Sequence, residues 1–167
     1  MRFPEFFAAA PRITVRDPLA RVLGAAEDGV LEYSYADTVK LAGHSCPTVA
    51  SAYLMTRAAM RALYPATLPE RGGIKVELRG DRQEGVTGVV ANVASFLTGA
   101  THDTGFKGIG GHFDRRGLLF LATHGQNQAD NPLASYLLFR PDGENDGFLS
   151  AREIYETDVA ADLKAPV

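Results

Sequence analysis

The stretch that decides the fold runs from Leu41 to Met60, LAGHSCPTVASAYLMTRAAM. Pro47 suits the first position of a helix, because a proline lacks the backbone N–H that would have no helical partner there. After Pro47 the sequence stays apolar on nearly every side until Tyr64-Pro65, where a helix is expected to stop. A helix that is apolar all round is normally buried on most of its sides. The stretch therefore predicts a buried central helix over 47–63.

The rest of the chain predicts shorter helices and strands around this helix. We expect short helices over 3–10, 18–25 and 35–43, a longer helix over 87–97 that closes at Gly99, and a last helix over 150–163. Alternating or apolar runs predict strands over 30–34, 74–78, 117–124 and 134–140. Because the later strands follow one another in pairs, the sequence predicts an α+β fold. Its expected form is a mainly antiparallel sheet packed against the buried central helix that starts at the Gly-His-Ser-Cys-Pro segment.

Length and charge limit the kinds of protein that this chain can be. A chain of 167 residues has the size of one domain, so we expect a single domain over 1–167. The net charge of −3 and the pI near 5.8 provide no basic surface, and we expect neither nucleic acid nor membrane as a partner. Pro4 and Glu5 interrupt the N-terminal stretch that could otherwise be a signal peptide. One cysteine permits no internal disulfide, which fits a cytoplasmic protein.

The single cysteine, Cys46, takes the cap position of the expected central helix. There it faces N–H groups without helical partners and the positive end of the helix dipole, which favour the thiolate over the thiol. His44 is two residues away, and side chains at i and i+2 share a face in extended backbone. The pair is therefore suited to bind a transition metal, or to act as a nucleophile with its base. A buried structural thiol beside a helix-capping histidine explains the same spacing.

Two blocks of the sequence resemble a known family. GHSCPTVASAYLMTRAAM is similar to the Gly-His-x-Cys-Pro segment that opens the core domain of the FmdE family, which is named after formylmethanofuran dehydrogenase. FLTGATHDTGFKG is similar to that family's second block, a Thr-Gly-Cys-Thr motif followed by Gly-Lys-Gly, although Ala100 stands where the block has its cysteine. Together the blocks span about Ala36 to Phe120. One cysteine cannot build the C-terminal zinc finger that some members carry.

The resemblance implies an α+β core, a homodimer, and a metal or active centre near the His-Cys segment. On this basis we expect His44 and Cys46 to hold a transition metal ion, with zinc first and iron or nickel as alternatives. His124, at a strand end, and His102, in the loop after the 87–97 helix, are the candidates for further ligands. In a homodimer the missing ligands could also come from the partner chain.

Other interpretations stay open on the sequence. The chain could be a metal-free thiol enzyme, with Cys46 as nucleophile and His44 or His124 as base. It could also be a non-catalytic accessory or binding module, in which the His-Cys segment only holds the fold together. Asp103 is a weaker candidate for an oxygen ligand, and Lys107 for neutralising an anionic substrate. The sequence does not decide whether the protein is an enzyme or which small molecule it would bind.

The segment DGENDGFLSARE, from Asp142 to Glu153, has two interpretations. Its acidic residues and Gly147 are spaced like the ligands and the turn glycine of a calcium-binding loop. However, the apolar run before it predicts a strand, whereas such a loop follows a helix. We therefore favour a tight turn, with Ser150 capping the final helix.

Overall fold

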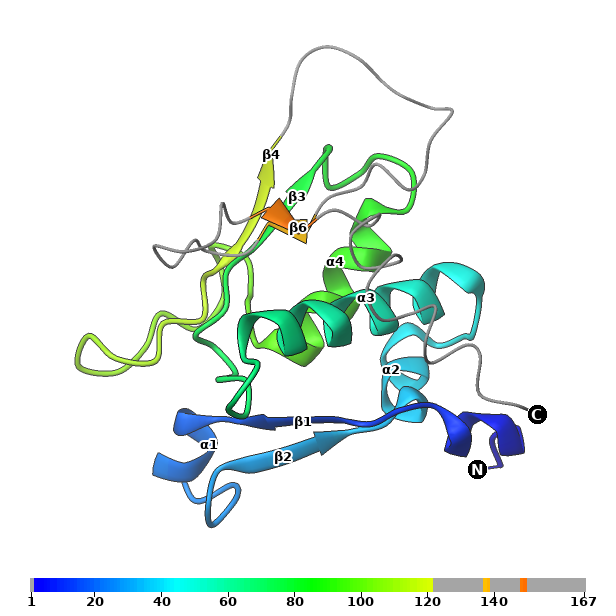
Figure 1. Cartoon of the computed structure of the whole chain (residues 1–167). Helices are drawn as coiled ribbons and strands as arrows, with labels where there is room; N and C mark the ends of the chain where they lie inside the picture. The colour runs from blue at the N-terminus through cyan, green and yellow to red at the C-terminus, as the bar shows by residue number, and fades with distance from the viewer. Residues whose placement is uncertain (1, 122–136, 139–147, 150–167) are drawn as a thin grey trace.

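The structure of the chain is a computed structural model, which describes residues 2–121, 137–138 and 148–149 (Figure 1). Helices and strands are both present, so the predicted α+β class is confirmed. In Figure 1 the central helix α3 (Pro47–Leu63) crosses the middle of the molecule. A two-stranded ribbon lies below it, and the strands of a second sheet lie above it.

Helix α3 has the bounds that the sequence predicted. Its buried side chains are Val49, Ala52, Tyr53, Thr56, Ala59 and Met60. The helix packs against α4 (Thr87–Thr98) and α2 (Tyr35–Ala42). The Tyr53 hydroxyl lies 2.7 Å from the carbonyl oxygen of Pro11, to which it donates, and 3.2 Å from that of Tyr33. These bonds tie the central helix to the N-terminal ribbon.

Helix α2 has a defined start and end. Ser34 caps its first turn and forms a capping box with Asp37, in which each side chain bonds the backbone N–H of the other residue. Hydrogen bonds from Lys40 and Ser34 lower the pKa of Asp37 to about 2. The helix ends at Ala42, and its cap residue Gly43 has a φ of 75°, a left-handed conformation that favours glycine. A three-residue connection, 44–46, then leads directly into α3.

The ribbon contains a strand that the sequence did not predict. β1 (Ile13–Arg16) pairs antiparallel with β2 (Val30–Tyr33), and Ile13 lies opposite Tyr33. Ile13 and Val15 are buried, whereas Thr14 is half-buried and Arg16 exposed, which is the alternation of a strand with one face on the core. The ribbon is flanked by two short helices, η1 (Glu5–Ala9) and α1 (Pro18–Val22).

The second sheet has the strand order β4-β3-β5-β6. Its strands are β3 (Val76–Arg79), β4 (Leu118–Leu121), β5 (Leu137–Leu138) and β6 (Phe148–Leu149). β3 pairs with β5, and β5 with β6, in antiparallel fashion, although no strand was predicted at the position of β6. However, β3 and β4 are parallel, and α4 makes the long connection that a parallel pair requires. The described sheet is thus mixed, with a β3–α4–β4 unit beside antiparallel strands.

Some expected elements lie outside the described residues. These are the final helix over 150–163, most of the strand over 134–140, and the Asp142–Glu153 segment except for Phe148 and Leu149.

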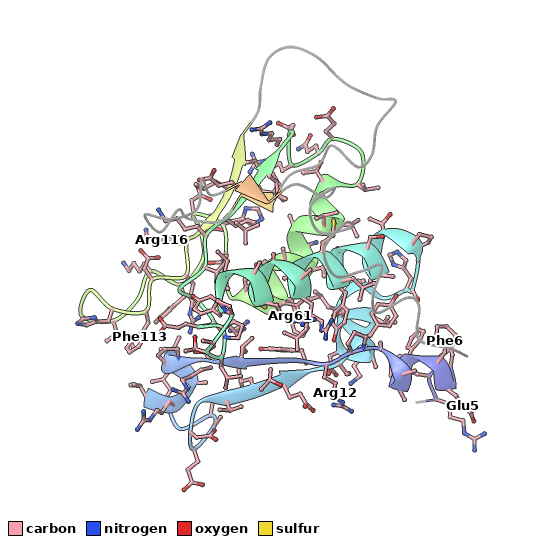
Figure 2. The ribbon with its side chains drawn as sticks, in the orientation of Figure 1. Glu5, Phe6, Arg12, Arg61, Phe113 and Arg116 are labelled. Atoms are coloured by element: carbon pink, nitrogen blue, oxygen red, sulfur yellow. The ribbon has the colours of Figure 1, made fainter. Side chains whose placement is uncertain are left out.

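Figure 2 shows Glu5 and Phe6 on η1 at one end of the molecule, and Phe113 and Arg116 in the loop before β4 at the other.

A buried ion cluster joins the ribbon to the rest of the fold. The Asp17 carboxylate accepts hydrogen bonds from Arg71, at 2.9 Å, from Arg115, at 2.5 Å, and from the Ala20 N–H at the start of α1. The side chains of Asp17 and Arg115 are only 4% and 6% exposed. Burial by itself raises the pKa of Asp17, but the Ala20 N–H and the two guanidinium groups together lower it below its ordinary value.

Close approach of backbone to the Arg115 guanidinium requires glycine at position 72. Gly72 has a φ of 90°, and a Cβ built there would overlap Nη1 of Arg115. That same nitrogen donates to the carbonyl oxygen of Arg71, at 2.5 Å. The Arg71 guanidinium in turn donates to the carbonyl oxygen of Phe96, at 3.0 Å. The cluster therefore connects the ribbon, the 69–73 loop, the end of α4 and the loop before β4.

Replacing Asp17 with Asn should destabilise the protein strongly. Two largely buried guanidinium groups would lose the only carboxylate that contacts them among the described residues. We expect a loss of about 3 kcal/mol, the lower end of the range for breaking a buried ion pair, because Arg71 keeps some contact with solvent. Urea unfolding followed by circular dichroism at pH 7 measures this change.

Asp114→Asn is the matched control, because it breaks an exposed ion pair with Arg116 and should leave the urea midpoint nearly unchanged.

The stability that Asp17 provides should depend on pH. The pKa of folded Asp17 is lowered, so its contribution to the free energy of unfolding is present above the unfolded pKa near 4 and is lost as the pH falls below that value. The wild-type stability should therefore decline more steeply in acid than that of Asp17→Asn. Asp17→Asn and Asp114→Asn losing the same free energy of unfolding at pH 7 would contradict the prediction.

Candidate functional site

Cys46 lies at the start of α3, where the sequence predicted it. Its backbone is extended (φ −147°, ψ 169°), and its side chain is half-buried. The thiol makes no standard capping hydrogen bond. Even so, the Val49 N–H is close enough to lower the pKa of Cys46, and the His44 imidazole and the Thr48 N–H lower it further. These contributions outweigh the desolvation of the sulfur, which acts in the opposite direction.

The start of α3 leaves these N–H groups available. The first helical hydrogen bond runs from the Ala50 N–H to the carbonyl oxygen of Cys46, at 3.0 Å. Pro47 has no N–H, so Thr48 and Val49 carry the free donors of the first turn. Both N–H groups act on the Cys46 sulfur and favour its negative charge. The local sequence thus builds an environment that favours a thiolate.

His44 is exposed, and one hydrogen bond to the backbone orients its ring. Its Nδ1 lies 3.0 Å from the carbonyl oxygen of Ala42. A carbonyl can only accept, so Nδ1 carries the proton in this bond, and the neutral ring has its lone pair on Nε2. The Ala42 carbonyl first, and then Cys46, raise the pKa of His44 above its ordinary value. The two shifts are opposed, so the charged form of each group favours the charged form of the other.

The other predicted ligands do not join this pair among the described residues. His102 stacks on the Phe120 ring, with centroids 5.3 Å apart, and lines a hollow of about 370 Å³ together with Arg82, Asn92 and Asp103. His124 lies outside the described residues. Within the part of the chain that the structure describes, no group of three or more histidine, cysteine, aspartate or glutamate residues could hold a metal ion. There, His44 and Cys46 form a pair without a third ligand.

The comparisons with known proteins identify the family. A family model for the CHAT domain matches residues 47–165, which is 119 of the 167 residues. The chain belongs to the CHAT domain family. This is a caspase-like protease family. No curated protein and no solved structure matches the chain.

The resemblance to the FmdE family was therefore wrong, and so was the FmdE-type metal-binding function drawn from it. The metal ion itself is untested and stays a prediction. The two blocks are short, and a His-x-Cys segment before a helix that starts with proline is a weak signal by itself. In the second block, Ala100 replaces the cysteine and is a core residue, 1% exposed. The position that should have supplied a second thiol thus packs against the interior.

The family gave no local signal in the sequence around the candidate site. Caspase signatures surround the catalytic cysteine, and no such signature surrounds Cys46. The available signal was the strand–helix–strand order of 74–121, which forms the parallel β3–α4–β4 unit. The prediction that paired the 117–124 strand with the next strand along the chain missed this parallel pairing.

Other predictions about partners and location are tested only in part. No helix in the described part of the chain is long and apolar enough to cross a membrane. The homodimer, the small-molecule ligand and the cytoplasmic location stay predictions.

Alkylation of Cys46 by iodoacetamide should show an apparent pKa below that of an ordinary thiol, because the helix start and His44 favour the thiolate. His44→Gln should raise this apparent pKa and slow alkylation at pH 7 several-fold, because it removes the imidazolium charge. Reaction rates from pH 5 to 10, followed by mass spectrometry of the intact protein, measure both.

His102→Gln is the matched control, because His102 stacks on Phe120 and no interaction described in the structure joins it to the pair. Its alkylation profile should match that of the wild type. An ordinary pKa in the wild-type protein, or the same shift in both histidine variants, would contradict the assignment of His44 as the partner of Cys46.

Proposed function

We propose that the protein is a protease-like module that uses the Cys46 thiolate as a nucleophile, with His44 as its proton-transfer partner. The observation that carries this proposal is the His44–Cys46 pair at the start of α3, with its opposed pKa shifts. Membership of a caspase-like protease family supports the same class of chemistry. The Ala42 carbonyl supplies the third group, which orients the base.

The proposed reaction is acyl transfer from a peptide bond. The thiolate of Cys46 attacks the peptide carbonyl carbon, and the negative charge moves from sulfur to the carbonyl oxygen. The His44 imidazolium gives its proton to the departing amine as the C–N bond breaks, which leaves a thioester on Cys46. His44, now neutral, takes a proton from water as the water attacks the thioester. The acid product leaves, and the thiolate–imidazolium pair is restored.

The start of α3 supports both charged states in this scheme. The free N–H groups of Thr48 and Val49 stabilise the thiolate before the attack. Hydrogen-bond donors that stabilise the developing oxyanion lower the barrier to acyl transfer. The N–H groups of Thr48 and Val49 are the donors that α3 presents next to the Cys46 sulfur.

A second candidate function is a non-catalytic CHAT module that recognises peptide without cutting it. The observation in its favour is that the matched residues, 47–165, contain no cysteine, because Cys46 directly precedes them. In this case the His-Cys pair would be a structural feature of the α2–α3 connection.

A peptide acyloxymethyl ketone library, used on the full chain, tests the proposal. We expect one label per molecule, at Cys46, with a rate far above that of free cysteine. Cys46→Ser should abolish the label, and His44→Gln should slow it strongly. Ser51→Ala, at an exposed position of α3, is the control and should react like the wild type.

Labelling no faster than that of free cysteine, for every peptide in the library, would overturn the proposal. Peptides that bind wild-type protein and Cys46→Ser equally well, without being cleaved by either, would support the non-catalytic module instead.

A further inference from the structure

Tyr35, the first residue of α2, connects the aromatic core to the short segment that carries the site. Its ring is buried, 7% exposed, and lies edge-on to Phe7, at 4.9 Å between centroids, and to Tyr53, at 5.5 Å. Two packed rings on either side leave it little freedom to rotate. Its hydroxyl oxygen lies 2.8 Å from Oγ of Ser45, which is a hydrogen bond.

Ser45 is the residue between His44 and Cys46. The segment 44–46 has no secondary structure of its own, since α2 ends at Ala42 and α3 begins at Pro47. No backbone N–H of these three residues donates to another backbone group among the described residues. The segment is held by the covalent chain at its two ends, by the His44–Ala42 bond, by the Ser45–Tyr35 bond, and at Cys46 by the bond from the Ala50 N–H to its carbonyl oxygen. Cys46 also packs partly against the core, at the start of α3. For Ser45, between the two site residues, the described tie to the core is the hydrogen bond to the buried Tyr35 side chain.

We infer that Tyr35 is the positioning residue of the site: its hydroxyl holds Ser45, and through Ser45 it fixes His44 and Cys46 at the start of α3. This inference rests on the proposed function, in which these two residues do the chemistry. Tyr35 itself touches neither the sulfur nor the imidazole through any described interaction. It acts by limiting the positions that the 44–46 segment can take.

Fixing the 44–46 segment matters because His44 and the start of α3 stabilise the Cys46 thiolate only when they lie close to the sulfur. A thiolate is stabilised by N–H groups and by an imidazolium only at short range. If Ser45 loses its anchor, the segment samples positions in which the sulfur is farther from Val49 and from His44. The thiol pKa then returns toward its ordinary value, although every group that touches the sulfur is still present.

Tyr35→Phe tests this inference, because it removes one oxygen atom and leaves the buried ring in place. We expect alkylation of Cys46 at pH 7 to slow about three- to tenfold, the effect of losing one hydrogen bond, and the apparent pKa to rise. Ser45→Ala should have the same effect, and the double variant should be no slower than either single variant, because both remove the same bond.

Tyr53→Phe is the matched control. It removes a hydroxyl from the same aromatic cluster, but this hydroxyl bonds the carbonyl oxygens of Pro11 and Tyr33. It should lower the unfolding temperature and leave the pH profile of Cys46 alkylation unchanged. A purely structural role of Tyr35 would give it the same behaviour as Tyr53.

The outcomes separate this inference from the proposed function. A low wild-type pKa that Tyr35→Phe and Ser45→Ala leave unchanged overturns the role of Tyr35, and the proposed nucleophile survives. A pKa shift in both variants, with no labelling of the wild type by any peptide probe, supports the positioning role and overturns the protease-like function.

Discussion

The contact on which most of the fold depends is the one between the Asp17 carboxylate and two guanidinium groups. Asp17 caps the start of α1, Arg71 lies between α3 and β3, and Arg115 precedes β4, so one carboxylate joins three distant parts of the chain. Such a contact cannot relax locally, because each arginine also bonds a backbone carbonyl. Charged groups that are removed from water must be paired, and this requirement fixes how the ribbon sits against the helices.

The candidate site, unlike the ion cluster, does not depend on contacts between distant parts of the chain. Its residues are neighbours in sequence, and they lie on a three-residue connection between two well-defined helices. Gly43 caps the end of the first helix and Pro47 starts the second, so both ends of the connection are defined, and the Ser45–Tyr35 bond holds its middle. A rigid frame around an exposed, irregular segment is how many proteins hold reactive side chains. Here the frame also supplies the electrostatics, through the carbonyl end of α2 at His44 and the N–H end of α3 at Cys46.

The parts of this structure that local sequence determines were predictable, and the others were not. The start and the approximate end of helix α3 were predicted correctly because Pro47 and Tyr64-Pro65 mark them. Strand β1 was missed because only Ile13 and Val15 carry its alternation. The ion cluster could not be predicted, since Asp17 and Arg115 are 98 positions apart and nothing local links them. The place of the His-Cys pair was predictable because it needs only one helix start, whereas the family assignment from two short blocks was wrong.

The position of the aromatic core has a consequence for how the protein can be divided. The family match starts at residue 47, yet Phe7, Ile13, Val15, Tyr35 and Val39 are buried members of the same hydrophobic cluster as Val49, Tyr53 and Met60. A fragment that begins at residue 47 would lack the buried apolar residues of the first 46 positions, and the side of α3 that packs against them would be exposed to water. The region that defines membership of the family is thus smaller than the region that folds, and the first 46 residues complete the interior of the domain.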